Sequence, residues 1–321
     1  MSVRAPFPPS HPGFWPRYWV TLRPYLFFVS GSIGWVGLAL GDVVQGVELG
    51  LAMLAFFLTY GLGQALTDTT QTDTDAISAP YRPLVRGEIT KSAVVAVSLT
   101  GLAACALVFA WLNPWTLAVS LLCVVGLATY TPLKRRWWGG PPWNSWIVAL
   151  LPLIGWLSHG GRPWEALAQP GLGGAMLSAF GTYATFVLLG YLKDVEADRA
   201  SGYDTFPVHF GRRATVVASA VFGTLGLVGS LVLILPSMSG AMVGLAMWGV
   251  GFLTLAGVHL RCLPLVRDEQ AGPLLVYGVL GLVWIHLGEA ALLRPDGTAF
   301  LVVVAVLAVP ALLARPSKEQ V

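Results

Sequence analysis

The stretch GVELGLAMLAFFLTYGLGQALTDTTQTDTD, residues 46–75, combines the two features that decide the fold. Its first part, 46–67, is an apolar run, and a helix of about 20 apolar residues is long enough to cross a bilayer. Its last part is polar and holds Asp68, Asp73 and Asp75. Carboxylates are costly at the end of a membrane helix unless a partner compensates their charge. The stretch therefore predicts a membrane-spanning helix that ends in a polar site.

The whole chain has the composition of a membrane protein. Of its 321 residues, 55% are hydrophobic and 11% are charged, whereas soluble domains carry about 25% charged residues. No run of like charges indicates a nucleic-acid partner. Apolar runs between turn signals predict an all-α, multi-pass integral membrane protein. The predicted spans are 24–42, 46–67, 92–111, 114–130, 143–158, 174–193, 214–235, 239–260, 272–293 and 298–314.

The basic residues give these spans an orientation. If the N-terminus is cytoplasmic and the spans alternate, only Arg162 and Arg294 of the 19 basic residues fall on the opposite side. Cytoplasmic loops carry the excess of Lys and Arg, so the count supports this topology, with a location in the cell membrane. We expect an N-terminal tail over 1–19, a membrane domain over 20–314 and a C-terminal tail over 315–321.

Two long polar loops on the predicted cytoplasmic side hold clusters of acidic residues. If the helix over 46–67 continued, Asp68, Gln71 and Asp75 would lie on one face, with Asp73 about two residues away from it. In the second loop, Asp194 and Asp198 are four residues apart and also share a helical face. Such acids can simply solvate helix ends or pair with nearby bases. Two clusters on the same side favour a functional site instead.

Divalent cations explain why two acidic faces would oppose each other. Mg²⁺ takes a few carboxylates and keeps other positions for water and phosphate, and it stabilises a diphosphate leaving group. Arg82, Lys134 and Lys193 are basic residues suited to phosphate oxygens. The surrounding helices are apolar, so the remainder of the substrate should be apolar too. An isoprenyl diphosphate has both properties.

The sequence resembles the UbiA superfamily of intramembrane prenyltransferases. That family carries Asn-Asp-x-x-Asp-x-x-x-Asp and then Pro-x-Arg-Pro, which correspond to 67–75 and 80–83 here. Its second motif corresponds to Asp-Val-Glu-Ala-Asp-Arg at 194–199, followed by a similar tail over 202–211. The remaining matches are the Tyr-x-x-x-Lys pattern at Tyr130 and Lys134 and the Arg-Pro pair at Arg23 and Pro24. The resemblance covers about residues 20–293.

The resemblance implies a helical barrel of nine transmembrane helices with a cavity open to lipid, to which 298–314 would add a possible tenth. It also implies Mg²⁺-dependent ionisation of a prenyl diphosphate and transfer to an aromatic or lipid acceptor. By position, the catalytic residues would be Asp75, Asp194 and Asp198. The metal ligands would be Asp68, Gln71, Asp75, Asp194 and Asp198, and the substrate-binding residues Arg23, Arg82, Tyr130, Lys134 and Lys193.

Departures from the family pattern leave two alternatives open. Thr67 replaces the motif Asn and Gln71 replaces the central Asp, and an amide oxygen brings no charge to a metal. One alternative is a terpene cyclase that needs no acceptor, and the other is a prenyl-lipid-binding protein without catalysis. Outside the motifs, His286 and Glu289 share a helical face, where they form either a structural pair or a base near an acceptor.

Overall fold

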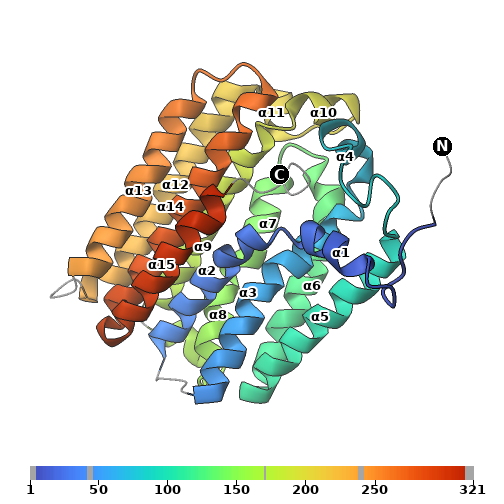
Figure 1. Ribbon diagram of the computed structural model, residues 1–321. Coiled ribbons are helices and arrows are strands. Elements are labelled where there is room, and N and C mark those ends of the chain that lie inside the picture. The colour runs from blue at the N-terminus through green and yellow to red at the C-terminus, as the bar shows by residue number, and fades with distance from the viewer. Residues whose placement is uncertain (1–4, 42–45, 170, 238–241, 315–321) are drawn as a thin grey trace.

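The computed structural model describes residues 5–41, 46–169, 171–237 and 242–314, and these ranges form a bundle of helices (Figure 1). Within them the only β-contact is an isolated bridge between Arg136 and Asp204. The helices of the bundle are α2 (Phe27–Leu40), α3 (Gly46–Asp68), α5 (Lys91–Leu112), α6 (Trp115–Lys134), α7 (Gly140–Ala149), α8 (Leu151–Leu157), α9 (Leu172–Tyr191), α12 (Arg212–Ile234), α13 (Met242–Cys262), α14 (Gly272–Leu293) and α15 (Thr298–Leu313). The predicted all-α fold is thus correct.

Every predicted span contains helix, but two of them differ from a single long helix. Eight helices in the described part are long and apolar enough to cross a membrane. The span predicted at 24–42 is a 3-10 turn followed by α2, which has only 14 residues. The span at 143–158 is divided into α7 and α8, and Pro152 follows the division. Because proline has no backbone N–H, it is favoured in the first turn of a new helix and disfavoured inside a continuous one. A count of nine or ten spans is therefore not established.

Glycines let the central helices approach each other closely. A Cβ on Gly181 of α9 would lie 2.3 Å from the backbone nitrogen of Gly226 in α12, and one on Gly229 would lie 2.5 Å from the backbone nitrogen of Ser178. Small residues at such crossings are the usual means of packing helices in a bilayer, where the hydrophobic effect does not drive association. Outward-facing residues such as Leu107, Val221 and Leu253 are exposed and apolar, as a lipid-facing surface requires.

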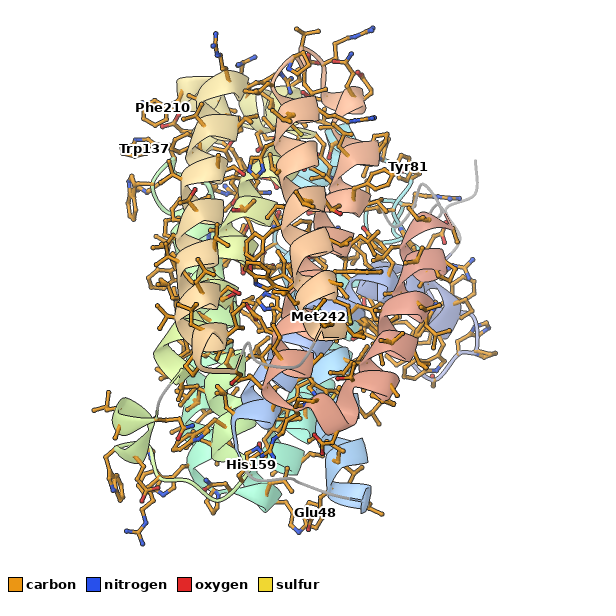
Figure 2. The ribbon with its side chains drawn as sticks, turned by 90° about the vertical axis from the view of Figure 1, so that its left-hand side faces the viewer. Glu48, Tyr81, Trp137, His159, Phe210 and Met242 are labelled. Atoms are coloured by element: carbon orange, nitrogen blue, oxygen red, sulfur yellow. The ribbon has the colours of Figure 1, made fainter. Side chains whose placement is uncertain are left out.

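Short helices gather at one end of the bundle. These are α4 (Thr72–Ser78), α10 (Val195–Ala200) and α11 (Phe206–Phe210), which lie together at the top of Figure 1. Figure 2 shows Trp137 and Phe210 at this end and Glu48 and His159 near the opposite end. Both predicted acidic loops therefore meet at the same end of the protein.

The N-terminal region contains a helix that the sequence analysis did not predict. Helix α1 (Phe14–Leu22) begins inside the predicted tail 1–19. It buries Phe14 and Tyr18 and leaves Trp15 and Trp19 about half exposed, a pattern typical of a helix at the membrane interface. Arg17 pairs with Glu88 at 2.6 Å and so ties α1 to the loop before α5. The predicted tail 315–321 lies outside the described residues.

Candidate active site

The first acidic segment is a broken helix rather than a continuous one. α3 ends at Asp68, and α4 starts at Thr72. At the break, the hydroxyls of Thr69 and Thr70 donate to the carbonyls of Leu66 and Thr67 at 2.7 and 2.8 Å. Threonine side chains that bond to nearby backbone compete with helix continuation. One continuous helix, the condition under which Asp68, Gln71 and Asp75 would share a face, is therefore not what the structure shows.

The break still brings the predicted residues of the segment together. Asp68, Gln71 and Asp75 all line one cavity. Asp73 points elsewhere: its carboxylate accepts hydrogen bonds from Tyr203 and Arg135, each at 3.0 Å. It ties the first acidic segment to the second and to the end of α6.

The second acidic segment places its two aspartates differently. Asp194 is the residue before α10 and lines the cavity, whereas Asp198 lies inside α10 and is fully buried. One Asp198 oxygen, Oδ2, accepts a hydrogen bond from Thr205 at 3.1 Å. The other, Oδ1, has no hydrogen-bond partner among the described residues. Burial raises the pKa of Asp198 to about 6, although Lys134 acts to lower it.

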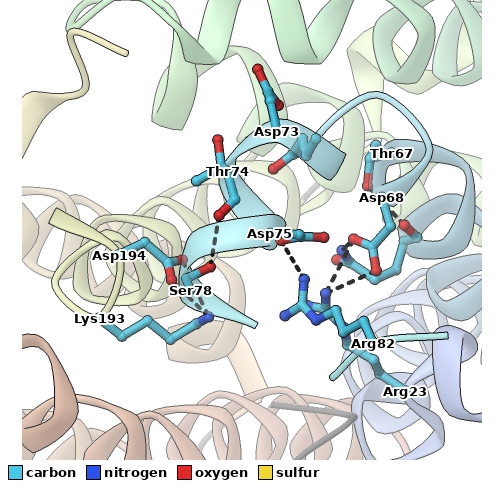
Figure 3. Close-up of polar contacts among 12 residues, drawn as sticks. Arg23, Thr67, Asp68, Asp73, Thr74, Asp75, Ser78, Arg82, Lys193 and Asp194 are labelled. Atoms are coloured by element: carbon cyan, nitrogen blue, oxygen red, sulfur yellow. Dashed lines mark hydrogen bonds and ion pairs between the residues drawn. The ribbon is translucent and has the colours of Figure 1, made fainter. Parts of the chain in front are cut away.

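Basic side chains hold each carboxylate of the cavity (Figure 3). Arg23 contacts Asp68 at 2.9 Å, Arg82 contacts Asp75 at 2.5 Å, and Lys193 contacts Asp194 at 3.2 Å. Burial raises the pKa of Asp75 despite its arginine partner. Burial also acts to raise the pKa of Asp194, but Lys193 and the other nearby bases outweigh it and hold the pKa below its usual value.

We call these three ion pairs, together with Lys134 and Gln71, the charged layer of the cavity. Two further contacts complete it. Lys134 donates to the amide oxygen of Gln71 at 2.8 Å, so the residue that replaces the family's aspartate is engaged by a cation. Gln64, one helical turn before Asp68, donates to that aspartate at 2.7 Å. Arg23 has a φ of 52°, the only positive value for a non-glycine residue in the described ranges. Such backbone strain is found at sites where a side chain must be aimed.

The cavity has a volume of about 570 Å³ and changes in character along its depth. One end is charged, a group of tyrosines follows, and the rest is apolar. Leu107 of α5 and Leu121 of α6 line the cavity and are also 65% and 58% exposed. The cavity therefore reaches the lipid-facing surface between these two helices, as a lateral opening to the membrane requires.

Most of the predicted site residues meet in this cavity, and one does not. Those that line it are Arg23, Asp68, Gln71, Asp75, Arg82, Tyr130, Lys134, Lys193 and Asp194. Asp198 lies behind this lining. Residues that the prediction missed also line it, among them Tyr60, Gln64, Asn144, Tyr183 and Tyr191. Two of the missed residues could have been found from helical spacing. Gln64 lies four residues before Asp68, and Tyr191 lies three residues before Asp194.

The donor set suits a hard divalent cation. It consists of carboxylate and amide oxygens, which Mg²⁺ prefers, and Oδ1 of Asp198 is a buried acceptor without a partner among the described residues. No group of three Asp, Glu, His or Cys side chains within those residues is close enough to hold a metal. The ion pairs explain this, because each cavity carboxylate faces a base. A metal would take the place of those bases.

His286 and Glu289 lie apart from the cavity lining. His286 Nδ1 contacts Glu289 Oε2 at 2.7 Å, and Ser178 and Ser230 donate to Oε1 at 2.6 and 2.5 Å. His286 Nε2 contacts the Thr182 hydroxyl at 3.0 Å. These buried groups join α9, α12 and α14, which favours the structural pair over the base near an acceptor.

The fold and the site together define an intramembrane protein with one cavity that is charged at one end and mostly apolar along the rest. Comparison with known proteins gives the family. The UbiA prenyltransferase family matches residues 26–273. The chain therefore belongs to the UbiA prenyltransferase family, and the resemblance seen in the sequence is confirmed.

Individual relatives agree with this assignment. A digeranylgeranylglyceryl phosphate synthase of Natronomonas pharaonis is 28% identical over 65% of this chain and 74% of its own length. The synthase of the same name from Thermococcus kodakarensis is 28% identical over 74% of this chain and 80% of its own length.

Solved structures show the same fold. A UbiA homolog from Aeropyrum pernix K1 matches with a TM-score of 0.71 at 18% identity, over 82% of this chain and 96% of its own. A UbiA homolog from Archaeoglobus fulgidus, bound to DMAPP and Mg²⁺, matches with a TM-score of 0.63 at 17% identity, over 85% and 99%. At these identities the match concerns the fold alone.

Proposed function

We propose that this chain transfers the prenyl group of an isoprenyl diphosphate to a lipid acceptor that carries a hydroxyl, in a reaction that requires Mg²⁺. The observation that carries the proposal is the single cavity, with paired acids and bases at one end and an apolar wall that opens to lipid between α5 and α6. The names of the relatives support the lipid acceptor, because their product is a glyceryl phosphate with geranylgeranyl groups.

The charged layer would bind the head group of the substrate. Arg23, Arg82, Lys134 and Lys193 are the bases that would contact diphosphate oxygens, because charge-assisted bonds to phosphate are the strongest that these side chains form. Their present carboxylate partners would then be released. Asp68, Asp75, Asp194 and Asp198, with the amide of Gln71, are the residues that would hold Mg²⁺. When bound, the metal supplies neutralisation of the charge on the leaving diphosphate.

The reaction exchanges one carbon–oxygen bond for another. The bond between C1 of the prenyl group and the diphosphate oxygen breaks, and its electron pair leaves with the diphosphate. A lone pair of the acceptor hydroxyl oxygen forms the new bond to C1, and the hydroxyl loses its proton. The products are an ether and protonated diphosphate. The apolar walls keep water away from C1, so that the acceptor hydroxyl and not water is the nucleophile.

The site is proposed to face the cytoplasm of a cell in whose membrane the chain lies. The support is the distribution of basic residues, most of which are at the end that carries α4, α10 and α11. A single cysteine placed in α11 would test the orientation. Its access to a thiol-labelling reagent would be compared between intact cells and inverted vesicles.

A direct assay tests the activity. Purified protein in nanodiscs would receive geranylgeranyl diphosphate and Mg²⁺, with and without the geranylgeranyl monoether of glyceryl phosphate. We expect a diether product only with acceptor, and its loss with EDTA or in Asp75→Asn and Asp194→Asn. Leu253→Ala, on the lipid-facing side of α13, is the control. A cyclic hydrocarbon formed without acceptor would establish the cyclase alternative, and diphosphate binding without turnover for any acceptor would establish the non-catalytic one.

A further inference from the structure

Five polar side chains form a hydrogen-bonded belt across the cavity below the charged layer. The belt consists of Tyr60, Tyr130, Asn144, Tyr183 and Tyr191, and all five line the cavity. The hydroxyls of Tyr60 and Tyr183 are 3.2 Å apart, and those of Tyr130 and Tyr191 are 3.0 Å apart. Asn144 joins the two pairs, because it donates to Tyr183 at 3.4 Å and also interacts with Tyr130.

The belt comes from four different helices, so no single element explains it. Tyr60 belongs to α3, Tyr130 to α6, Asn144 to α7, and the other two tyrosines to α9. Packing alone does not explain the belt. Phenylalanine or leucine would fill the same space in an apolar wall without a hydroxyl that needs a hydrogen-bond partner. Polar groups inside a membrane protein are costly and mark functional positions unless they only pair with each other.

The hydroxyl pairs have bonding capacity left over. Each tyrosine hydroxyl has one O–H donor and two acceptor lone pairs. One O–H is enough for the bond within a pair, so the second O–H of the pair and the remaining lone pairs can serve a third group. A hydroxyl of a ligand, which is both donor and acceptor, is the simplest group that fits between such partners.

The depth of the belt relates it to the reacting carbon. Tyr130 lies one turn before Lys134 in α6, and Tyr60 lies eight residues before Asp68 in α3. At a rise of 1.5 Å per residue, the two levels of the belt are about 6 and 12 Å below the charged layer. A diphosphate bound in the charged layer would hold C1 at the upper level of the belt. The apolar wall, with Ile147, Leu151 and Ile154, begins beyond it.

We infer that the belt is the binding site for the nucleophilic hydroxyl of the acceptor lipid. This inference rests on the proposed function. A nucleophile must reach C1 from the side opposite the leaving diphosphate, and that side is the belt. The charged layer is committed to diphosphate, and the rest of the lining is mostly apolar. The Ser30 and Thr59 hydroxyls, which also line the cavity, already donate to the Phe56 carbonyl. The acceptor is therefore recognised as an alcohol by the Asn144 amide and the tyrosine hydroxyls, while its apolar chain remains toward the opening between α5 and α6.

The proton of the acceptor has a route in the same arrangement. When the acceptor oxygen bonds to C1, its proton passes to a belt hydroxyl, which releases its own proton along the Tyr130–Tyr191 pair. The departing diphosphate in the charged layer, one turn away, accepts it. The belt ends the reaction in the protonation state in which it began.

Binding measurements with matched lipids test the inference without reliance on turnover. The probes are the geranylgeranyl monoether of glyceryl phosphate and its analogue with hydrogen in place of the free hydroxyl. Each would be titrated into nanodiscs that contain the protein, Mg²⁺ and inorganic diphosphate. We expect the wild type to bind the alcohol about tenfold more tightly than the analogue, as one or two buried hydrogen bonds would give.

Substitutions in the belt should remove this preference and nothing else. Asn144→Leu and Tyr183→Phe should bind both probes with equal affinity, and their affinity for geranylgeranyl diphosphate should stay within twofold of the wild type. Ser145→Ala is the control, because Ser145 is on α7 but, among the described residues, its hydroxyl bonds only to the Pro141 carbonyl. In the transfer assay, both belt variants should raise the KM for the acceptor and leave the KM for the prenyl diphosphate unchanged.

The outcomes separate this inference from the proposed function. Equal binding of alcohol and analogue by the wild type, or a preference that survives in both belt variants, would overturn the belt as the acceptor site even if transfer occurs. A preference that disappears in the variants supports the belt even if the wild type shows no transfer, in which case the proposed function alone fails.

Discussion

Removing the carboxylate of Glu289 should lower the free energy of unfolding of the protein without a direct effect on the transfer reaction. Glu289 is fully buried, and it accepts hydrogen bonds from Ser178, Ser230 and His286. Glu289→Ala leaves these three donors without their acceptor. Hydrogen bonds inside membrane proteins average about 0.6 kcal/mol, which sets a lower limit of roughly 2 kcal/mol. The desolvation of buried, unpaired groups costs about 1–3 kcal/mol each, so three of them raise the expected loss to between roughly 2 and 9 kcal/mol.

The assay is unfolding by sodium dodecyl sulfate in mixed micelles, followed by tryptophan fluorescence. Glu289→Gln keeps one carbonyl acceptor and should lose about 1 kcal/mol. Thr224→Val on α12 is the control, because Thr224 is exposed and its hydroxyl donates to the Ala220 carbonyl of its own helix, its one side-chain hydrogen bond within the described ranges. Its free energy of unfolding should stay within about 0.5 kcal/mol of the wild type, as is usual for surface substitutions.

Two results would refute this reasoning. An unchanged free energy of unfolding in Glu289→Ala would show that the network does not stabilise the bundle. A folded Glu289→Gln that loses transfer activity by orders of magnitude would show that Glu289 acts as a base, the alternative that the sequence leaves open. Because Glu289 does not line the cavity, we expect Glu289→Gln to retain activity at temperatures where it is folded.

Three further predictions concern the acidic segments. Gln71→Asp adds a carboxylate beside Lys134, and it should lower the Mg²⁺ concentration for half-maximal activity about three- to tenfold; an unchanged requirement would show that position 71 does not touch the metal. Burial raises the pKa of Asp198 to about 6, so its carboxyl is neutral below that pH, and Mg²⁺ affinity measured by calorimetry should fall up to about tenfold per pH unit there. The raised pKa also means that metal-free protein gains stability as the pH falls through about 6 toward 3.8, and Asp198→Asn should abolish both effects. Asp268 accepts from the Glu196 backbone at 2.9 Å and pairs with Arg212, so Asp268→Ala should speed amide exchange in α10 and lower kcat, whereas normal exchange would exclude this anchoring.

Helix positions could be predicted from the sequence wherever one apolar run equals one helix. The runs at 92–111 and 272–293 agree with α5 and α14 to within about a residue. The division between α7 and α8 could not be predicted in this way, because the hydropathy of an apolar run does not show where its backbone breaks. Helix α1 was missed for the opposite reason: its nine residues are too few to cross a bilayer, and its burial depends on packing against α3.

The candidate site was predicted in its residue types but not in its pairings. Residues of one motif, such as Asp68 and Asp75, could be grouped from their spacing alone. The partners of these residues could not, because Arg23 and Asp68 are 45 positions apart and meet only through the fold. Asn144 and Tyr183 belong to no charged motif, and in the sequence they resemble ordinary residues of apolar helices. The position of Asp198 behind the cavity lining could not be predicted, because helical spacing does not show which neighbour covers a side chain.

The ion pairs of the charged layer have a consequence for the order in which ligands bind. In Arg23–Asp68, Arg82–Asp75 and Lys193–Asp194, each partner serves as the counterion of the other, and the three pairs add no net charge to the cavity. A metal bound to the acids would leave the bases without their counterions, and a diphosphate bound to the bases would leave the acids without theirs. Either ligand alone therefore leaves buried charges uncompensated. Together they satisfy both sets. Each ligand must therefore raise the affinity for the other by the same factor. As a result, the affinity of the protein for divalent cations is low until the anionic substrate is bound.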